Sequence, residues 1–90
     1  MTSPSIQKAP PIRFHGSRLL ELREKHGLSQ TDLGVMLYQH GASKRPVHPN
    51  VIGQWEKNEY MPASRMLIAL SRVFGVPSEV FFSDQIQGEQ

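Results

Sequence analysis

The sequence predicts an all-α domain of five short helices, and three observations support this prediction. Apolar residues recur three and four positions apart over most of the chain, as they do along the buried side of a helix. Serine, proline and glycine residues stand where these stretches begin and end. No segment shows the alternation of apolar and polar residues that is typical of a strand. With 90 residues, the chain has the length of one domain with one core.

The first two predicted helices are separated by a short turn. Ser17 is the expected N-cap of the first helix, and Gly27 is expected to end it. Ser29 begins the second helix, and Asp32, three residues on, can return the second hydrogen bond of a capping box. Gly41 is expected to end the second helix, because glycine readily adopts the left-handed conformation found after a helix.

Three further helices are predicted after a loop that contains two prolines. Pro49 suits the first turn of the third helix, where its missing N–H has no partner to lose. Ile52 and Trp55 form the buried side of this helix. The fourth helix is predicted over residues 65–74, and a short fifth helix over residues 77–82.

The two ends of the chain lack helical spacing. Residues 1–15 contain three prolines, and we expect them to form a flexible N-terminal arm. Residues 84–90 are mostly polar and are expected to form a flexible tail. The folded domain is therefore predicted to span residues 16–83.

The formal net charge is only +2, but the charges are unevenly distributed. No carboxylate occurs between Asp32 and Glu56, whereas Lys44 and Arg45 lie inside that segment. A surface that faces DNA phosphates must be free of carboxylates, because they would repel the polyanion. A gap of this length also arises by chance in a chain with 20% charged residues, so the distribution alone leaves both interpretations open.

Several classes of protein are disfavoured by what the sequence lacks. It has no cysteine, no glycine-rich phosphate loop and no pair of carboxylates spaced for acid–base catalysis, so we predict no enzyme and no cofactor. The histidines lack the spacing of zinc ligands, so we predict no metal site; they are His15, His26, His40 and His48. No apolar run is long enough to cross a membrane. We expect a cytoplasmic protein, associated with the nucleoid.

Three segments occur in a characteristic order: LLELREKHGLSQTDLG, VIGQWEKNEYMP and MLIALSRVFGVPSEVFF. Together they resemble the Xre or Cro/C1-type helix-turn-helix family, to which the lambdoid phage repressors belong. The resemblance covers about residues 16–82. It implies a lambda-repressor-like domain of five helices with the helix-turn-helix in its middle, and it implies binding to double-stranded DNA.

The resemblance also implies which residues read the bases. The reading positions of the family fall on Pro49, Asn50 and Gln54. Asparagine and glutamine amides can bond adenine through its N6 and N7 atoms in the major groove. Outside this motif, both amides would simply be solvated side chains. Pro49 departs from the polar residue often found at its position, and His48 is a candidate to take over its contact.

The same resemblance implies phosphate contacts and one structural ion pair. Helix N-termini attract anions, and Gln30 matches the family residue that bonds a phosphate there. Arg23 and Glu56 match a partly buried ion pair between the first and third helices, which we interpret as structural. The full set of expected phosphate contacts is Ser29, Gln30, Lys44, Arg45, His48, Lys57 and Asn58.

The largest departure from the family is the turn between the second and third helices, which is lengthened by the segment YQHGASKRPVHP (residues 38–49). Lys44 and Arg45 in this segment could contact phosphate. The segment could equally contact a partner protein, or serve as a disordered spacer. These three interpretations stay open at the level of sequence.

We predict a sequence-specific DNA-binding protein that regulates transcription, more often as a repressor than as an activator. A homodimer on a two-fold symmetric site is expected, since paired half-sites increase affinity and specificity. Val80, Phe81 and Phe82 could supply the dimer contact or pack on their own core. The alternative is a protein-interaction module of the same fold, of the antitoxin or bridging coactivator type, that acts mainly through a partner protein.

Overall fold

A computed structural model describes residues 13–82, which form four α-helices and one 3₁₀ helix. These are α2 (Gly16–Lys25), α3 (Gln30–Gln39), α4 (Pro49–Glu56), α5 (Ser64–Phe74) and the 3₁₀ helix η1 (Ser78–Phe82). No strand occurs among these residues, so the predicted all-α class is confirmed. The predicted fifth helix is corrected to the 3₁₀ type, since its five residues are too short a run for a regular α-helix.

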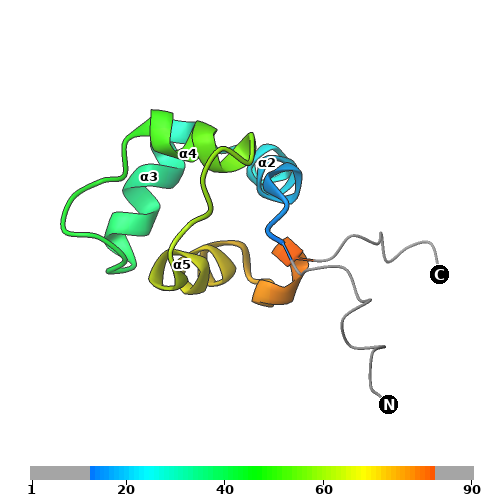
Figure 1. Cartoon of the computed structure of the whole chain (residues 1–90). Helices are drawn as coiled ribbons and strands as arrows, with labels where there is room; N and C mark the ends of the chain where they lie inside the picture. Colours follow the sequence, from blue (N-terminus) through cyan, green and yellow to red (C-terminus); the bar gives the residue numbers. More distant parts are fainter. Residues whose placement is uncertain (1–12, 83–90) are drawn as a thin grey trace, which may run out of the picture.

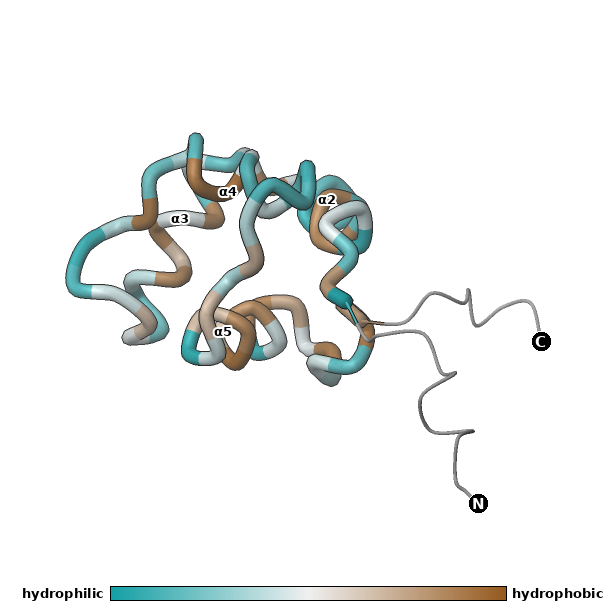
Figure 2. Tube along the Cα trace, in the orientation of Figure 1, coloured by the Kyte–Doolittle hydropathy of each residue, from teal (hydrophilic) through white to brown (hydrophobic). Residues whose placement is uncertain are grey.

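The helices form two layers around one core, with α4 and α5 on opposite sides of the domain (Figure 1). α3 packs against both of them, α2 packs against α4, and η1 contacts α2 and α5. Figure 2 shows the apolar parts of the helices turned inward and a polar stretch along the loop between α3 and α4. Leucine, isoleucine and phenylalanine side chains fill the centre without access to solvent; they are Leu19, Leu33, Leu37, Ile52, Leu70 and Phe81. Within residues 13–82, no helix is both long enough and apolar enough to cross a membrane.

The start of α2 differs from the prediction. The predicted N-cap, Ser17, lies inside the helix, which begins at Gly16 after His15. A Cβ atom on Gly16 would collide with the backbone carbonyl oxygens of Trp55 and Glu56. The glycine therefore lets the start of α2 lie directly against the end of α4, and this tertiary contact sets the position of the helix start.

The packed part of the chain begins before the predicted boundary at residue 16. Phe14, assigned to the flexible arm, is only 3% exposed, and its ring stacks on that of Phe81 with centroids 6.0 Å apart. The backbone N–H of His15 donates to the carbonyl of Phe81. Residues 1–12 of the predicted arm and residues 84–90 of the predicted tail lie outside the described residues. Phe81 is thus part of the domain's own core, whereas the sequence had left both core packing and a dimer contact open for it.

The long loop between α3 and α4 is fastened at both ends. After α3, Gly41 adopts a positive φ of 83° and Ala42 returns a hydrogen bond to the carbonyl of Leu37, which buries the alanine. Before α4, the N–H of Val47 donates to the carbonyl of Gly34. A Cβ on Gly34 would collide with the Val47 carbonyl oxygen. The interpretation of this loop as a disordered spacer is therefore wrong.

The close approach of α2 to α4 can be tested by adding one methyl group. We expect Gly16→Ala to lower the free energy of unfolding by about 1–3 kcal/mol, because the new Cβ would force two helices apart. Denaturant unfolding followed by circular dichroism measures the effect. Ser17→Ala is the matched control on an exposed neighbour and should change stability by less than about 0.5 kcal/mol. Equal stability of the two variants would contradict the proposed contact.

Candidate nucleic-acid interface

A nearly buried ion pair connects α2 to α4. The Arg23 Nε lies 2.5 Å from Glu56 Oε2, and its Nη2 donates to Glu56 Oε1 at 3.3 Å. The side chains are 13% and 6% exposed. The hydrogen bond to Glu56 raises the pKa of Arg23 above its ordinary value. Arg23 also donates to the carbonyl of Leu28, in the turn before α3. The ion pair predicted for these two residues is present, and it holds three segments of the chain together.

Gln30, the first residue of α3, extends this network. Its Nε2 donates to Glu56 Oε1 at 3.1 Å, so the carboxylate accepts from both Gln30 and Arg23. Gly53 on α4 lies beneath the glutamine amide, and a Cβ there would come within 3.2 Å of Gln30 Nε2. The absence of a side chain at residue 53 thus makes room for the start of α3 to lie against α4.

The outer surface of α4 and the start of α3 form a shallow polar depression. Its lining brings together four residues that were predicted to contact DNA, from two helices and the residue after α4. The lining residues are Gln30, Asn50, Gly53, Gln54, Lys57 and Glu59. Ile52 and Trp55, on the other side of α4, are buried in the core, so this outer surface is rigidly oriented.

The N-terminus of α4 is fixed by a side chain that was predicted for a different role. His48 is the N-cap, and its Nδ1 accepts from the N–H of Asn50 at 3.0 Å. The bond requires an unprotonated Nδ1. Pro49 occupies the first helical position as predicted. This cap holds the first turn of α4 in place and leaves the Asn50 side chain exposed.

The N-terminus of α3 carries the predicted capping box. The hydroxyl of Ser29 accepts from the N–H of Asp32 at 2.9 Å, and the Asp32 carboxylate accepts from the N–H of Ser29 at 3.0 Å. Hydrogen bonding of the carboxylate to the Ser29 backbone N–H, and second to the Ser29 side chain, lowers the pKa of Asp32. The carboxylate therefore supports the helix above its ordinary titration range and loses this effect as the pH falls through its lowered pKa.

Asn58 is used inside the protein. Its backbone has a positive φ of 62°, its Oδ1 accepts from the N–H of Gly16, and its Nδ2 donates to the carbonyl of Phe14. These two bonds give the side chain a structural role that was not predicted, while the second N–H of Nδ2 leaves the predicted phosphate contact as a proposal. Lys57, the preceding residue, is exposed and lines the depression.

The two loop cations are placed apart from the other predicted contacts. Lys44 and Arg45 lie at the exposed tip of the loop and do not line the depression on α4. The Ser43 hydroxyl donates to the carbonyl of Arg45 at 2.6 Å, which shapes this tip. In Figure 1 the loop extends sideways from the pair of α3 and α4.

Two residues of the depression were not singled out as functional from the sequence. Gly53 acts through the space it leaves for Gln30. Glu59 adds a carboxylate beside the predicted DNA contacts, and its N–H donates to the carbonyl of Gln54. The sequence offered one indication of this placement: Glu59 comes three residues after Glu56, where the chain turns back onto the end of α4.

The geometry defines a helix-turn-helix in which α3 supports an outward-facing α4. The chain belongs to this family: the Helix-turn-helix family model matches residues 19–81, which confirms the resemblance to the Xre or Cro/C1-type proteins. The chain is also 39% identical over 66 residues to the "Putative HTH-type transcriptional regulatory protein" of Pyrococcus furiosus. That match covers 73% of this chain but only 18% of the length of the relative. No solved structure matched the chain.

The ion pair at the centre of the site can be tested by removing its cation. We expect Arg23→Ala to lower the free energy of unfolding by about 3–5 kcal/mol, because the buried Glu56 carboxylate would lose its cation and keep the neutral Gln30 amide as its side-chain donor. Denaturant unfolding measures the loss. Glu21→Ala is the control, since Glu21 pairs with Arg18 at an exposed position and should contribute at most about 1 kcal/mol.

The double variant Arg23→Ala with Glu56→Ala separates the pair from the individual side chains. If the ion pair is the main interaction, the double variant is less destabilised than the sum of the single variants. Strict additivity would show that the two side chains act independently.

Proposed function

We propose that this chain binds double-stranded DNA in a sequence-specific manner and regulates transcription, with α4 in the major groove. The observation that carries the proposal is the polar depression on α4. A rigid helix there presents Asn50 and Gln54 outward, while Gln30 and Lys57 flank them. The major groove admits one α-helix and displays a distinct donor and acceptor pattern for each base pair. The regulatory name of the relative supports the same function.

In this proposal, Asn50 and Gln54 are the base-reading residues. They lie four residues apart on one helix, so their amides project from the same side over successive base pairs. Pro49 contributes shape and helix initiation, because it has no side-chain donor. Glu59 adds an acceptor for the amino group of cytosine at the edge of the depression.

The proposed phosphate contacts surround this reading surface. Gln30 and Ser29 lie at the N-terminus of α3, where the helix dipole attracts anions. Lys57, the residue after α4, lines the same depression as Gln30. Lys44 and Arg45 would contact DNA phosphates beside the groove that α4 enters. His48, at the start of α4, would contact a further phosphate. Such contacts fix the position of the protein without reading sequence.

Repression by a homodimer, in the cytoplasm and on the nucleoid, is the form of regulation that we propose. Two copies on a symmetric site would place two α4 helices in successive major grooves. Because Phe81 is fully buried within the domain, the dimer contact would have to use other side chains, such as the half-buried Val80 and Phe82.

The reading residues can be tested once a preferred site has been selected from a random DNA pool. We expect Asn50→Ala with Gln54→Ala to weaken binding to that site by about 1–3 kcal/mol for each lost bidentate contact. Fluorescence anisotropy with a labelled duplex measures the affinity. Gln39→Ala, at an exposed position at the end of α3, is the control and should bind as the unchanged protein does.

Two outcomes would contradict this assignment. Unchanged affinity of the double variant would remove Asn50 and Gln54 as readers. Failure to enrich any sequence from the pool at moderate salt would favour the alternative, a protein-interaction module of the same fold.

The loop contacts predict a change in salt dependence. If Lys44 and Arg45 each neutralise one phosphate, the slope of log K against log salt should become shallower by about 1.8 in Lys44→Ala with Arg45→Ala. Anisotropy titrations at several salt concentrations give the slope. Lys25→Ala, on the exposed side of α2, is the control and should leave the slope unchanged. An unchanged slope in the loop variant would place the loop away from the DNA.

A further inference from the structure

A second surface of the domain, away from α4, has cations and no carboxylate in its lining. No Asp or Glu occurs in residues 33–55 or in residues 60–78. These two segments contain most of α3, the long loop and all of α5, which the fold brings together by packing α3 against α5. The start of the loop and α5 therefore share one surface, built from parts of the chain that are distant in sequence.

This surface is hollowed between the end of α3 and α5. The depression has a volume of about 300 Å³ and is lined by His40, Gly41 and Ala42 from one side. From α5 it is lined by Arg65, Ile68, Ala69 and Arg72. Positions 65, 68, 69 and 72 follow the spacing of three and four residues that places side chains on one side of a helix, here over two turns. The depression thus lies between one arginine at each end.

The depression is apolar in its centre and cationic at its rim. Ala42 and Ala69 are each 4% exposed and form its floor, while Ile68 is 51% exposed. Arg65 and Arg72 are both exposed, and no ion pair within residues 13–82 involves either of them. An exposed isoleucine between two unpaired guanidinium groups presents an apolar contact and two anion contacts at once.

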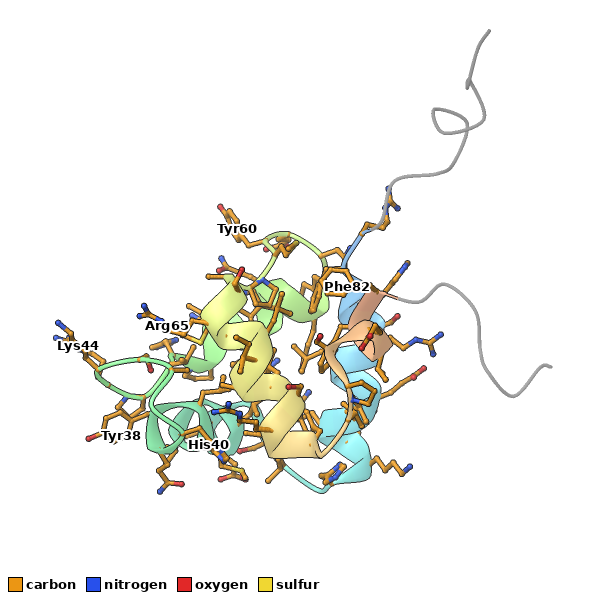
Figure 3. The ribbon with its side chains drawn as sticks, turned by 90° about the horizontal axis from the view of Figure 1, so that it is seen from below. Tyr38, His40, Lys44, Tyr60, Arg65 and Phe82 are labelled. Atoms are coloured by element: carbon orange, nitrogen blue, oxygen red, sulfur yellow. The ribbon has the colours of Figure 1, made fainter. Side chains whose placement is uncertain are left out.

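The arrangement of the labelled side chains agrees with this description. In Figure 3, which views the domain from below, Arg65 and His40 lie on the same side of α5, and Lys44 lies further out on the loop. Figure 1 shows α5 on the side of the domain opposite to α4. A molecule bound at the α5 depression would therefore leave the outer surface of α4 free.

We infer that the α5 depression binds an acidic amphipathic segment of a partner protein. An apolar side chain of that segment would cover Ile68 and Ala69, and carboxylates on either side of it would pair with Arg65 and Arg72. DNA fits less well. Its phosphates could pair with the arginines but make no favourable contact with the apolar floor, and the exposed Ile68 would face the charged DNA backbone. This inference goes beyond the proposed DNA binding and does not depend on it.

The test uses a synthetic helical peptide with leucines three and four residues apart and aspartate or glutamate between them. Titration into the isotopically labelled protein, without DNA, should shift the amide NMR signals of residues 40–42 and 65–72 and give a dissociation constant. Two control peptides carry either serine in place of the leucines or lysine in place of the acids. Both should bind at least about tenfold more weakly, because each lacks one half of the recognition chemistry.

Matched variants locate the contact. Arg65→Glu with Arg72→Glu should weaken binding of the acidic peptide by about tenfold or more, since carboxylates would then face carboxylates. Lys44→Glu with Arg45→Glu changes the net charge by the same amount at the loop tip and should have a much smaller effect. Ile68→Ser should also weaken binding, and thermal unfolding of each variant checks that it remains folded.

Four results would overturn the inference. These are the absence of shifts at the α5 depression, equal weakening by the two charge-reversal variants, equal binding of the serine peptide, and displacement of the peptide by duplex DNA at that surface. The last result would assign the surface to DNA. Failure of DNA binding in the selection experiment would leave the peptide titration unaffected, so the two proposals fail separately.

Discussion

The Glu56 carboxylate is the contact on which the rest of the domain depends. It lies at the end of α4, accepts from Arg23 on α2 and from Gln30 at the start of α3, and is almost fully buried. A buried charge must have partners, because desolvation without them costs several kcal/mol. Three helices therefore have to meet at this point. The same contact also orients the proposed interface, since Gln30 lines the depression on α4.

The lengthened turn is compatible with this arrangement because it begins and ends on α3. Ala42 is held below the last turn of α3, and Val47 is held against Gly34 in its middle. The residues between them can change in number or kind without moving α4, whose start follows directly after Val47 and is capped by His48. An insertion fixed in this way adds surface to the domain and leaves the relation of α3 to α4 intact.

Local features of the fold could be predicted from the sequence, whereas contacts between distant segments could not. The capping box of Ser29 and Asp32 and the helix end at Gly41 follow from residues a few positions apart. The start of α2 was misplaced because it depends on Gly16 meeting the backbone of α4, forty residues away in the chain. The structural contacts of Asn58 could not be predicted for a similar reason: its two partners, Gly16 and Phe14, become neighbours only in the folded domain.

The charges of the predicted site could likewise be read from the sequence, whereas their arrangement in space could not. A gap in carboxylates between Asp32 and Glu56 could be seen in the sequence, but its two cations, Lys44 and Arg45, lie at the loop tip and do not line the depression on α4. Lys57 joins the depression on α4 together with Glu59, so that surface is polar and of mixed charge. The depression beside α5 instead has two arginines, Arg65 and Arg72, and no carboxylate in its lining. The cations of the domain therefore do not by themselves indicate α4, and the proposal that α4 reads DNA rests on the amides of Asn50 and Gln54 in the lining of its depression.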